Sequence, residues 1–318
     1  MTLPKVFVSG ASGTVGSEVA IGIRRAGYTV YGLVRSPEKA KSLVLNEIIP
    51  VIGDLKRPET YAEIISRCSI VVHCASDYAD YGGVESVALD AFIQGLHNHK
   101  DSPHAARLIF TSGILVYKEN RSVDEPLSED APREGDSDLA FFQARLKNED
   151  FVLNLHKTHQ IHGIVVRPGY VFGKAQRHFY HYFDQALEGD VFIRGRGSVA
   201  WSKIHIDDLV DGYLRILAAG DDLPGAAALS QVSGEAFNFS DGLVDTNFEI
   251  AKAFAALAGY DGPEPREDLS LTSPMADKSV IVSSEKAKRV LGWRVRHQGL
   301  LDEAHLYWDL WRTRRAQQ

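Results

Sequence analysis

The feature that most constrains this chain is a glycine-rich turn near its start. Residues 6–16 read VFVSGASGTVG, an apolar run followed by three glycines at three-residue spacing, and a helical pattern follows over residues 17–26. Gly10 permits a tight turn out of the strand, Gly13 lets backbone approach a pyrophosphate, and Gly16 lets the helix lie close to the strand. This order predicts a dinucleotide site, although an ordinary βα turn can also contain glycines.

Short β-rich runs alternate with helical patterns through the first half of the chain. We expect strands at residues 5–9, 29–34, 49–52, 70–74, 108–111 and 164–167. Strict alternation implies a parallel sheet covered on both faces, with ligands at the carboxyl ends of the strands. The sequence therefore predicts an α/β protein with a Rossmann-type doubly wound parallel sheet and a smaller, mixed substrate-binding lobe.

The composition indicates a large core and a small-molecule ligand. The chain has 318 residues, of which 44% are hydrophobic, and a formal net charge of −7. A nucleic-acid surface needs clustered Lys and Arg, so nucleic acid is not an expected partner. Cys68 and Cys74 are the only cysteines, and we expect free thiols in a reducing compartment. A long apolar span and a leader pattern are both lacking, which predicts a cytoplasmic protein without a membrane segment.

Further motifs follow the glycine turn in a fixed order. They are GDL at 53–55, VVHCA at 71–75, FTSG at 110–113 followed by VY at 116–117, RPG at 167–169 and HIDD at 205–208. With these motifs the chain resembles the extended branch of the short-chain dehydrogenase/reductase superfamily. That branch contains nucleotide-sugar epimerases and dehydratases and the dihydroflavonol reductases.

The resemblance implies a domain organisation. It places an NAD(P)-binding Rossmann domain at residues 1–168 and a mainly substrate-binding lobe at 169–318, with segments near 200–215 and 236–240 returning to the first domain. It also implies a homodimer formed through helices at 85–97 and 138–156, and a small-molecule substrate.

The resemblance extends the nucleotide site beyond the glycine turn. It implies that Asp54 and Leu55 flank the adenine, and that Cys74, Ala75 and Ser76 line the middle of the groove. The full set of expected cofactor-binding residues is Gly10, Ser12, Gly13, Thr14, Val15, Gly16, Arg35, Asp54, Leu55, Cys74, Ala75, Ser76, Arg145, Pro168 and Gly169.

The end of the second expected strand indicates which nucleotide is preferred. An NAD enzyme places a carboxylate there, against the ribose 2′-hydroxyl, whereas this chain has Val34 and Arg35. Arg35 can donate forked, charge-assisted hydrogen bonds to a 2′-phosphate. Such a contact contributes about 1.5–3 kcal/mol, which predicts a preference for NADP(H) over NAD(H) of about ten- to a hundredfold. The alternative is that Arg35 is an ordinary solvated arginine.

The first catalytic position departs from the family pattern. The family uses a Ser or Thr after the fifth strand, four residues before the Tyr of its Val-Tyr motif. Counting back from Tyr117 places this hydroxyl position on Gly113, with Ser112 just before it. Ser112 and Tyr117 are therefore candidate catalytic residues, because each carries a hydroxyl that Gly113 lacks.

The second departure lies in the following helix, where the family has Tyr-x-x-x-Lys. The Tyr transfers a proton, and the Lys one helical turn later lowers the pKa of that Tyr and holds the ribose. Alignment through Glu149 puts Phe141 at the Tyr position and Arg145 at the Lys position. A phenyl ring cannot exchange a proton, whereas Arg145 keeps a positive charge that can bind nucleotide or stabilise an oxyanion.

Other tyrosines offer weaker substitutes for the missing acid. Tyr170 and Lys174 repeat the Tyr-x-x-x-Lys spacing in a loop, where the neighbouring Pro and Gly exclude the one-face geometry of a helix. Tyr78 and Tyr81 follow the fourth expected strand, at another edge of the same cleft, and Tyr117 follows the fifth. Packing alone accounts for an aromatic residue at each of these positions.

A metal site is not expected. His156, His159 and His162 do not converge on one face, and no Cys or carboxylate set completes a site. Asp207 and Asp208 read as a helix cap whose charge suits the helix dipole.

These residues favour an NADP(H)-dependent oxidoreductase that acts on a small organic carbonyl or alcohol. Loss of a general acid lowers the rate by a factor of about 10²–10⁴. Orientation of a hydride donor over the substrate lowers the activation barrier by several kcal/mol without that acid, so an enzyme is still expected. One alternative is a non-redox epimerase, dehydratase or isomerase with the same fold. The other is a non-catalytic NADP-sensing or scaffold protein, which the departures at Gly113, Phe141 and Arg145 favour.

Overall fold

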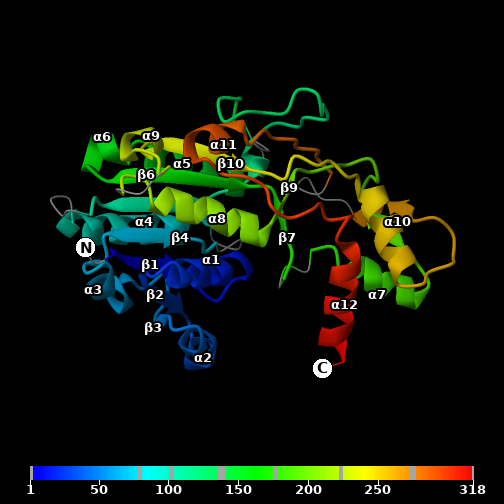
Figure 1. The fold of residues 1–318 in the computed structure, drawn as a ribbon, viewed down its shortest axis with the longest axis horizontal. Helices are drawn as coiled ribbons and strands as arrows, with labels where there is room; N and C mark the ends of the chain where they lie inside the picture. The colour runs from blue at the N-terminus through cyan, green and yellow to red at the C-terminus, as the bar shows by residue number, and fades with distance from the viewer. Residues whose placement is uncertain are drawn as a thin grey trace.

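A seven-stranded parallel sheet of order β10-β6-β5-β4-β1-β2-β3 forms the centre of the molecule, with helices on both faces (Figure 1). The computed structural model describes residues 3–76, 81–99, 104–134, 140–174, 176, 178–221, 225–271 and 277–316. The strands of this sheet are β1 (Lys5–Ser9), β2 (Thr29–Val34), β3 (Ile49–Ile52), β4 (Ile70–His73), β5 (Arg107–Thr111), β6 (His162–Pro168) and β10 (Glu235–Phe239). The expected α/β class with a Rossmann-type parallel sheet is confirmed.

Alternation of side chains along the strands divides the core between the two faces. In β1, Val6 and Val8 pack on one face and Phe7 on the other, and all three are fully buried. The first face is covered by α1 (Thr14–Arg25), α2 (Pro37–Leu45), α8 (Ile206–Leu217), α9 (Leu229–Val232) and α11 (Glu285–Leu291). The second face is covered by α3 (Ala62–Ile65), α4 (Tyr81–Leu96), α5 (Ala140–Leu153) and α6 (Leu155–His159).

Most element bounds agree with the sequence expectation, and the differences are small. Strands β1, β2 and β3 have the expected bounds, β4 ends one residue earlier, and β5 and β6 extend by one to three residues. The larger difference is that α1 begins at Thr14 rather than at residue 17. Gly13 is its N-cap, with φ of −80° and ψ of 168°, so the helix starts inside the glycine turn.

A smaller lobe follows β6. It contains two parallel strand pairs, β7 (Tyr170–Phe172) with β9 (Lys203–His205) and β8 (Phe192–Arg194) with β11 (Arg266–Asp268). Its aromatic core includes Phe183 and Phe254, whose rings stack at 4.5 Å. Its helices α7 (His181–Glu188), α10 (Asn247–Leu257) and α12 (Ala304–Arg315) lie together at one side of the large sheet in Figure 1.

The chain crosses back to the large sheet after entering the smaller lobe. Strand β10 pairs with β6 at the sheet edge, and α8 packs against α1. Short 3₁₀ turns complete the fold at Pro58–Thr60, His97–His99, Ile114–Val116 and Leu269–Leu271. Cys68 and Cys74 are free thiols. Among the described residues, no helix combines the length and the apolar character that crossing a membrane requires.

Candidate functional site

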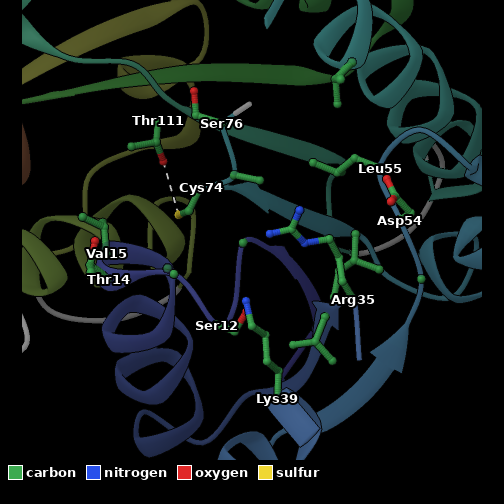
Figure 2. Close-up of a pocket in the computed structure, with 18 of the residues that line it drawn as sticks. Ser12, Thr14, Val15, Arg35, Lys39, Asp54, Leu55, Cys74, Ser76 and Thr111 are labelled. Atoms are coloured by element: carbon green, nitrogen blue, oxygen red, sulfur yellow. Dashed lines mark hydrogen bonds between the residues drawn. The ribbon is translucent and has the colours of Figure 1, made fainter. Parts of the chain in front are cut away.

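A cleft of about 700 Å³ opens at the carboxyl ends of the central strands (Figure 2). All but one of the residues expected to bind a cofactor line it: Gly10, Ser12, Gly13, Thr14, Val15, Gly16, Arg35, Asp54, Leu55, Cys74, Ala75, Ser76, Arg145 and Pro168. The catalytic candidate Ser112 also lines the cleft. The topology explains this convergence, because the carboxyl ends of neighbouring parallel strands meet at one edge of the sheet.

Gly169 is the exception. A Cβ at this position would lie 2.5 Å from the Ser202 carbonyl oxygen. The glycine is therefore needed for close packing between the start of β7 and the segment that leads into β9. This contact joins residues more than thirty positions apart, which a reading of the RPG motif cannot reveal.

The glycine turn forms one wall of the cleft. Gly10 has φ of +71°, and a Cβ there would lie 2.7 Å from the Ala75 backbone nitrogen. A Cβ on Gly16 would lie 2.3 Å from the Gly10 carbonyl oxygen. The Gly13 amide donates a 2.8 Å hydrogen bond to that same oxygen. The three glycines thus let backbone of the turn and of the first residues of α1 face the cleft, which suits a pyrophosphate at a helix N-terminus.

Two cationic side chains stand at the end of the cleft beside β2. Arg35 follows this strand and Lys39 lies in the first turn of α2; Figure 2 shows the guanidinium pointing into the cleft and the lysine reaching toward Ser12. Neither side chain forms an ion pair within the described part of the chain. Sequence reasoning missed Lys39, and the signal that was available is its position four residues after Arg35 at a helix start.

Hydroxyl groups and one thiol line the other end. The Thr111 hydroxyl donates to Cys74 Sγ at 3.3 Å, as drawn in Figure 2, and lies 2.6 Å from the Tyr213 hydroxyl oxygen. Burial raises the pKa of the Cys74 thiol to about 11. Ser112 is 7% exposed, and its hydroxyl has no hydrogen-bond partner among the residues that the structure describes. Ser112 is therefore a buried donor that no described protein group accepts.

The positions that depart from the family pattern lie next to one another. A Cβ on Gly113 would lie 3.4 Å from Nη1 of Arg145, and the Arg145 guanidinium carbon lies 4.6 Å from the centre of the Phe141 ring. Arg145 is 9% exposed and lines the cleft. The structure therefore brings these three positions together and offers a cation there, without the family's serine hydroxyl or phenol.

Tyr117 lies apart from the cleft. It is fully buried, and its hydroxyl donates to Oδ1 of Asn238 at 2.9 Å and accepts from Nη1 of Arg167 at 2.6 Å. Arg167 in turn pairs with Glu149 at 2.7 Å. Desolvation raises the pKa of Tyr117. Its hydroxyl belongs to a core network and does not reach a ligand in the cleft, so the structure does not support the catalytic candidacy of Tyr117.

Tyr170 and Lys174, which repeat the Tyr-x-x-x-Lys spacing, make their contacts away from the cleft. Tyr170 stacks on Trp201 at 4.4 Å, and the Lys174 ammonium pairs with Glu18 at 3.0 Å and with Asp207. Neither Tyr170 nor Lys174 lines the cleft. Tyr78 lies outside the described residues, and Tyr81 begins α4.

The expected helix cap at Asp207 and Asp208 is wrong. His205 is the N-cap of α8, and its Nδ1 accepts from the Asp207 amide at 3.1 Å. The two aspartates occupy the first turn, where their charge suits the helix dipole. Asp208 is buried and accepts hydrogen bonds from the ring and amide nitrogens of His297, so it holds the segment before α12.

Two histidine groupings bear on metal binding. The rings of His156 and His162 stack at 4.5 Å, an arrangement in which their nitrogens do not converge on one point. The ligand atoms of His205, Asp207 and His297 lie within 4.8 Å of one another. However, Nδ1 of His205 accepts a backbone hydrogen bond, which leaves the ring proton on Nε2, and an ammonium group already pairs with Asp207. These contacts oppose a cation in this cluster.

The comparisons with known proteins agree with this architecture. Residues 6–230 match the model of the NAD dependent epimerase/dehydratase family. A 3-beta-hydroxysteroid dehydrogenase of Mycolicibacterium neoaurum is 24% identical, over 83% of this chain and 73% of that protein. The 4-hydroxy-2-methyl-3-oxo-4-farnesyl-3,4-dihydroquinoline-1-oxide ketoreductase of Stigmatella aurantiaca is 25% identical, over 94% of this chain and 95% of its own length. A shorter match, 33% identical over 127 residues, covers 42% of an uncharacterized Schizosaccharomyces pombe protein.

Solved structures show the same fold. The dTDP-glucose 4,6-dehydratase of Bacillus anthracis, solved with NAD, superposes with a TM-score of 0.78. It is 18% identical, and the match covers 96% of each chain. At this identity the likeness speaks for the arrangement of elements and not for the substrate.

Proposed function

This chain belongs to the NAD dependent epimerase/dehydratase family, and from that premise we propose that it is an NADP(H)-dependent oxidoreductase acting on a small organic carbonyl or alcohol. The observation that carries the proposal is the cleft itself. It has a glycine-rich turn at a helix N-terminus, Arg35 and Lys39 at one end, and Ser112 and Arg145 at the other. When bound, the nicotinamide nucleotide supplies the hydride donor or acceptor.

The residues beside β2 support NADP(H) over NAD(H). Val34 and Arg35 occupy the place where a carboxylate would meet the ribose 2′-hydroxyl. Asp54 also lines the cleft, but its Oδ1 accepts a 2.9 Å hydrogen bond from the Lys56 amide in its own loop. Arg35 and Lys39 together offer two positive charges to a 2′-phosphate, one as a planar fork and one as a point charge.

The other end of the cleft supports stabilisation of a carbonyl oxygen. Ser112 can donate its hydroxyl to that oxygen, and Arg145 can stabilise negative charge that develops on it. An arginine stays protonated at any working pH, so Arg145 does not transfer the proton. Since Gly113 and Phe141 cannot transfer it either, we expect the oxygen to exchange its proton with water.

The relatives favour redox chemistry over the epimerase or dehydratase alternative. The two relatives described above that match most of this chain are named as a dehydrogenase and a ketoreductase. The second candidate function is a non-catalytic NADP sensor or scaffold, because the chain has Gly113, Phe141 and Arg145 in place of all three family catalytic residues at once. Such a protein would bind the nucleotide in the same cleft without turnover.

The experiment that tests the proposal is calorimetric titration with NADPH and, separately, with NADH. We expect wild-type protein to bind NADPH about ten- to a hundredfold more tightly. Arg35→Ala and Lys39→Ala should each weaken NADPH binding and leave NADH binding nearly intact. The control is Arg25→Ala, which removes an exposed arginine at the end of α1 outside the cleft.

Three results would contradict parts of the proposal. Equal loss of NADPH and NADH affinity in Arg35→Ala would remove the 2′-phosphate role. Tight NADPH binding without turnover on any carbonyl in a broad panel would favour the sensor. Binding of neither nucleotide would favour a scaffold that has kept the fold alone.

A further inference from the structure

A buried chain of three polar side chains joins the ends of β1 and β4 to the start of α4. Ser9 Oγ lies 2.5 Å from Nδ1 of His73, and Nε2 of His73 lies 2.5 Å from Oε2 of Glu85. Ser9 and His73 are 0% exposed and Glu85 is 1% exposed. With a neutral imidazole, the serine hydroxyl donates to Nδ1 and the Nε2 hydrogen is donated to the carboxylate, so both ring nitrogens are satisfied.

Stability alone does not account for this arrangement. The His73 ring packs against Phe92 and Phe110, with centroids 5.2 and 5.7 Å away, so its surroundings are aromatic. Oε1 of Glu85 is buried and has no hydrogen-bond partner within the described part of the chain. A buried polar atom without a partner is costly, and replacement of such groups by apolar side chains is often neutral or stabilising. The contribution of these three polar groups to stability therefore does not explain their presence in an aromatic core.

Their position in the chain supplies that reason. Each of the three is next in sequence to a residue that lines the nucleotide cleft, namely Gly10, Cys74 and Val84. The Cys74 amide also donates to the Ser9 carbonyl oxygen at 3.2 Å. The two loops approach so closely that a Cβ on Gly10 would lie 2.7 Å from the Ala75 nitrogen. A small shift of β1 relative to β4 would thus change the width of the cleft.

We propose that Ser9, His73 and Glu85 form a positioning relay for the nucleotide cleft, with His73 as its central positioning residue. The relay sets the spacing between the glycine turn, residues 74–76 and the first turns of α4. It touches no ligand and acts through the neighbouring residues that line the cleft. The proposal rests on nucleotide binding in this cleft, and the test below also examines the relay without a ligand.

The test compares His73→Phe, Ser9→Ala and Glu85→Gln with the wild-type protein. His73→Phe keeps an aromatic ring and removes both hydrogen bonds, whereas Glu85→Gln keeps an oxygen that accepts from Nε2. The matched control is Arg107→Met. Arg107 is the first residue of β5 and so lies at the end of the strand away from the cleft, where its buried guanidinium donates to the Leu217 carbonyl oxygen at 2.6 Å. Three quantities are measured: amide hydrogen exchange in the ligand-free protein, Kd for NADPH, and the thermal midpoint.

We expect His73→Phe to accelerate exchange at residues 10–16 and 74–76 and to raise the Kd for NADPH, each by roughly tenfold. The thermal midpoint should fall as well, because the change leaves the buried Glu85 carboxylate without its partner, so the comparison with Arg107→Met separates positioning from stability. Ser9→Ala should act in the same direction and Glu85→Gln more weakly. The effects of Ser9→Ala and Glu85→Gln on Kd should be non-additive, because both act through one imidazole. Arg107→Met should lower the midpoint and leave loop exchange and Kd unchanged.

Unchanged loop exchange in folded His73→Phe would overturn the relay, and so would an equal effect from Arg107→Met. If His73→Phe does not fold, Ser9→Ala decides by the same criteria. Should wild-type protein bind neither NADPH nor NADH, the proposed function fails, and exchange at residues 10–16 and 74–76 alone decides whether the relay positions these loops.

Discussion

At the scale of single residues, the chemistry of the cleft depends on Gly113, Phe141 and Arg145. The backbone at Gly113 is extended, with φ of 171°, so this position is open to any side chain. A Cβ there would make an ordinary contact of 3.4 Å with Arg145 Nη1. The backbone at Gly113 therefore has room for the serine hydroxyl of the family pattern. The site lacks an acid because of the residue types at these three positions and not because of the backbone conformation.

This geometry leads to a prediction for a restored acid. The triple change Gly113→Ser, Phe141→Tyr and Arg145→Lys should raise carbonyl reduction by about 10²–10⁴, because a phenol beside an ammonium can transfer a proton. Initial rates with NADPH on substrates that the wild type reduces provide the measurement. Phe151→Tyr, a half-buried position on the same helix, serves as the control. An unchanged rate in the triple variant would count against the alignment of α5 with the family pattern.

At the scale of elements, a buried ion pair between Glu149 and Arg167 connects α5 to strand β6 of the sheet. Glu149 on this helix is fully buried and accepts from Nε and Nη2 of Arg167, at 3.1 and 2.7 Å. Arg133 also donates to Glu149, at 2.9 Å. Because α5 carries Arg145 into the cleft, this pair connects the stability of the helix with the geometry of the site.

We predict that Glu149→Ala lowers the free energy of unfolding by about 3–5 kcal/mol, because the change leaves the Arg167 guanidinium buried without its counter-charge. Urea unfolding measures this loss, provided that the free energy of unfolding depends on urea concentration with the same slope in both proteins. The neighbouring Asp150 also pairs with Arg133 but is exposed, so Asp150→Ala should cost less than about 1 kcal/mol. Similar small losses in both variants would show that the buried pair does not anchor the helix.

At the scale of the whole molecule, buried ionisable groups make stability depend on pH. Desolvation lowers the pKa of His162 and of His205 from 6.5 to about 4, and neighbouring histidines add to the effect. Desolvation raises the pKa of Asp241 from 3.8 to about 6. Below pH 6.5 the unfolded chain binds protons that the two folded histidines exclude, so stability falls. Asp241 acts in the opposite sense, since below pH 6 the folded form binds a proton that the unfolded chain does not.

Between pH 7.5 and pH 5 these three groups contribute a net loss of about 2–3 kcal/mol to the free energy of unfolding, and His178, whose pKa burial also lowers to about 4, adds about 2 kcal/mol. Urea unfolding at the two pH values measures it. His205→Asn should remove about 2 kcal/mol of that loss, whereas Asp241→Asn should enlarge it. His305→Asn, which replaces a histidine at an exposed position in α12, is the matched surface control. A loss that His205→Asn leaves intact would exclude His205 as its source.

Local sequence patterns were enough to predict the strand, turn and helix at residues 5–25, the parallel sheet and the segments that line the cleft. These features follow from local causes. Short continuous apolar runs specify strands that are buried on both faces, and the glycines specify the turn. The carboxyl ends of parallel strands bring the loops after β1, β2, β4 and β5 together. The position of Arg35 at the end of β2 could be predicted for the same reason.

The partner of each buried polar side chain, by contrast, could not be predicted from local sequence and depends on the packing of distant segments. Tyr117 follows a strand end just as a catalytic residue would, yet its hydroxyl bonds to Asn238, 121 positions away. His73 reads as part of an ordinary buried strand, and its link to Ser9 spans 64 positions. Backbone conformation is largely set within a few residues, whereas a buried polar group bonds to whichever distant segment packs against it, and that choice is made only when the whole chain folds.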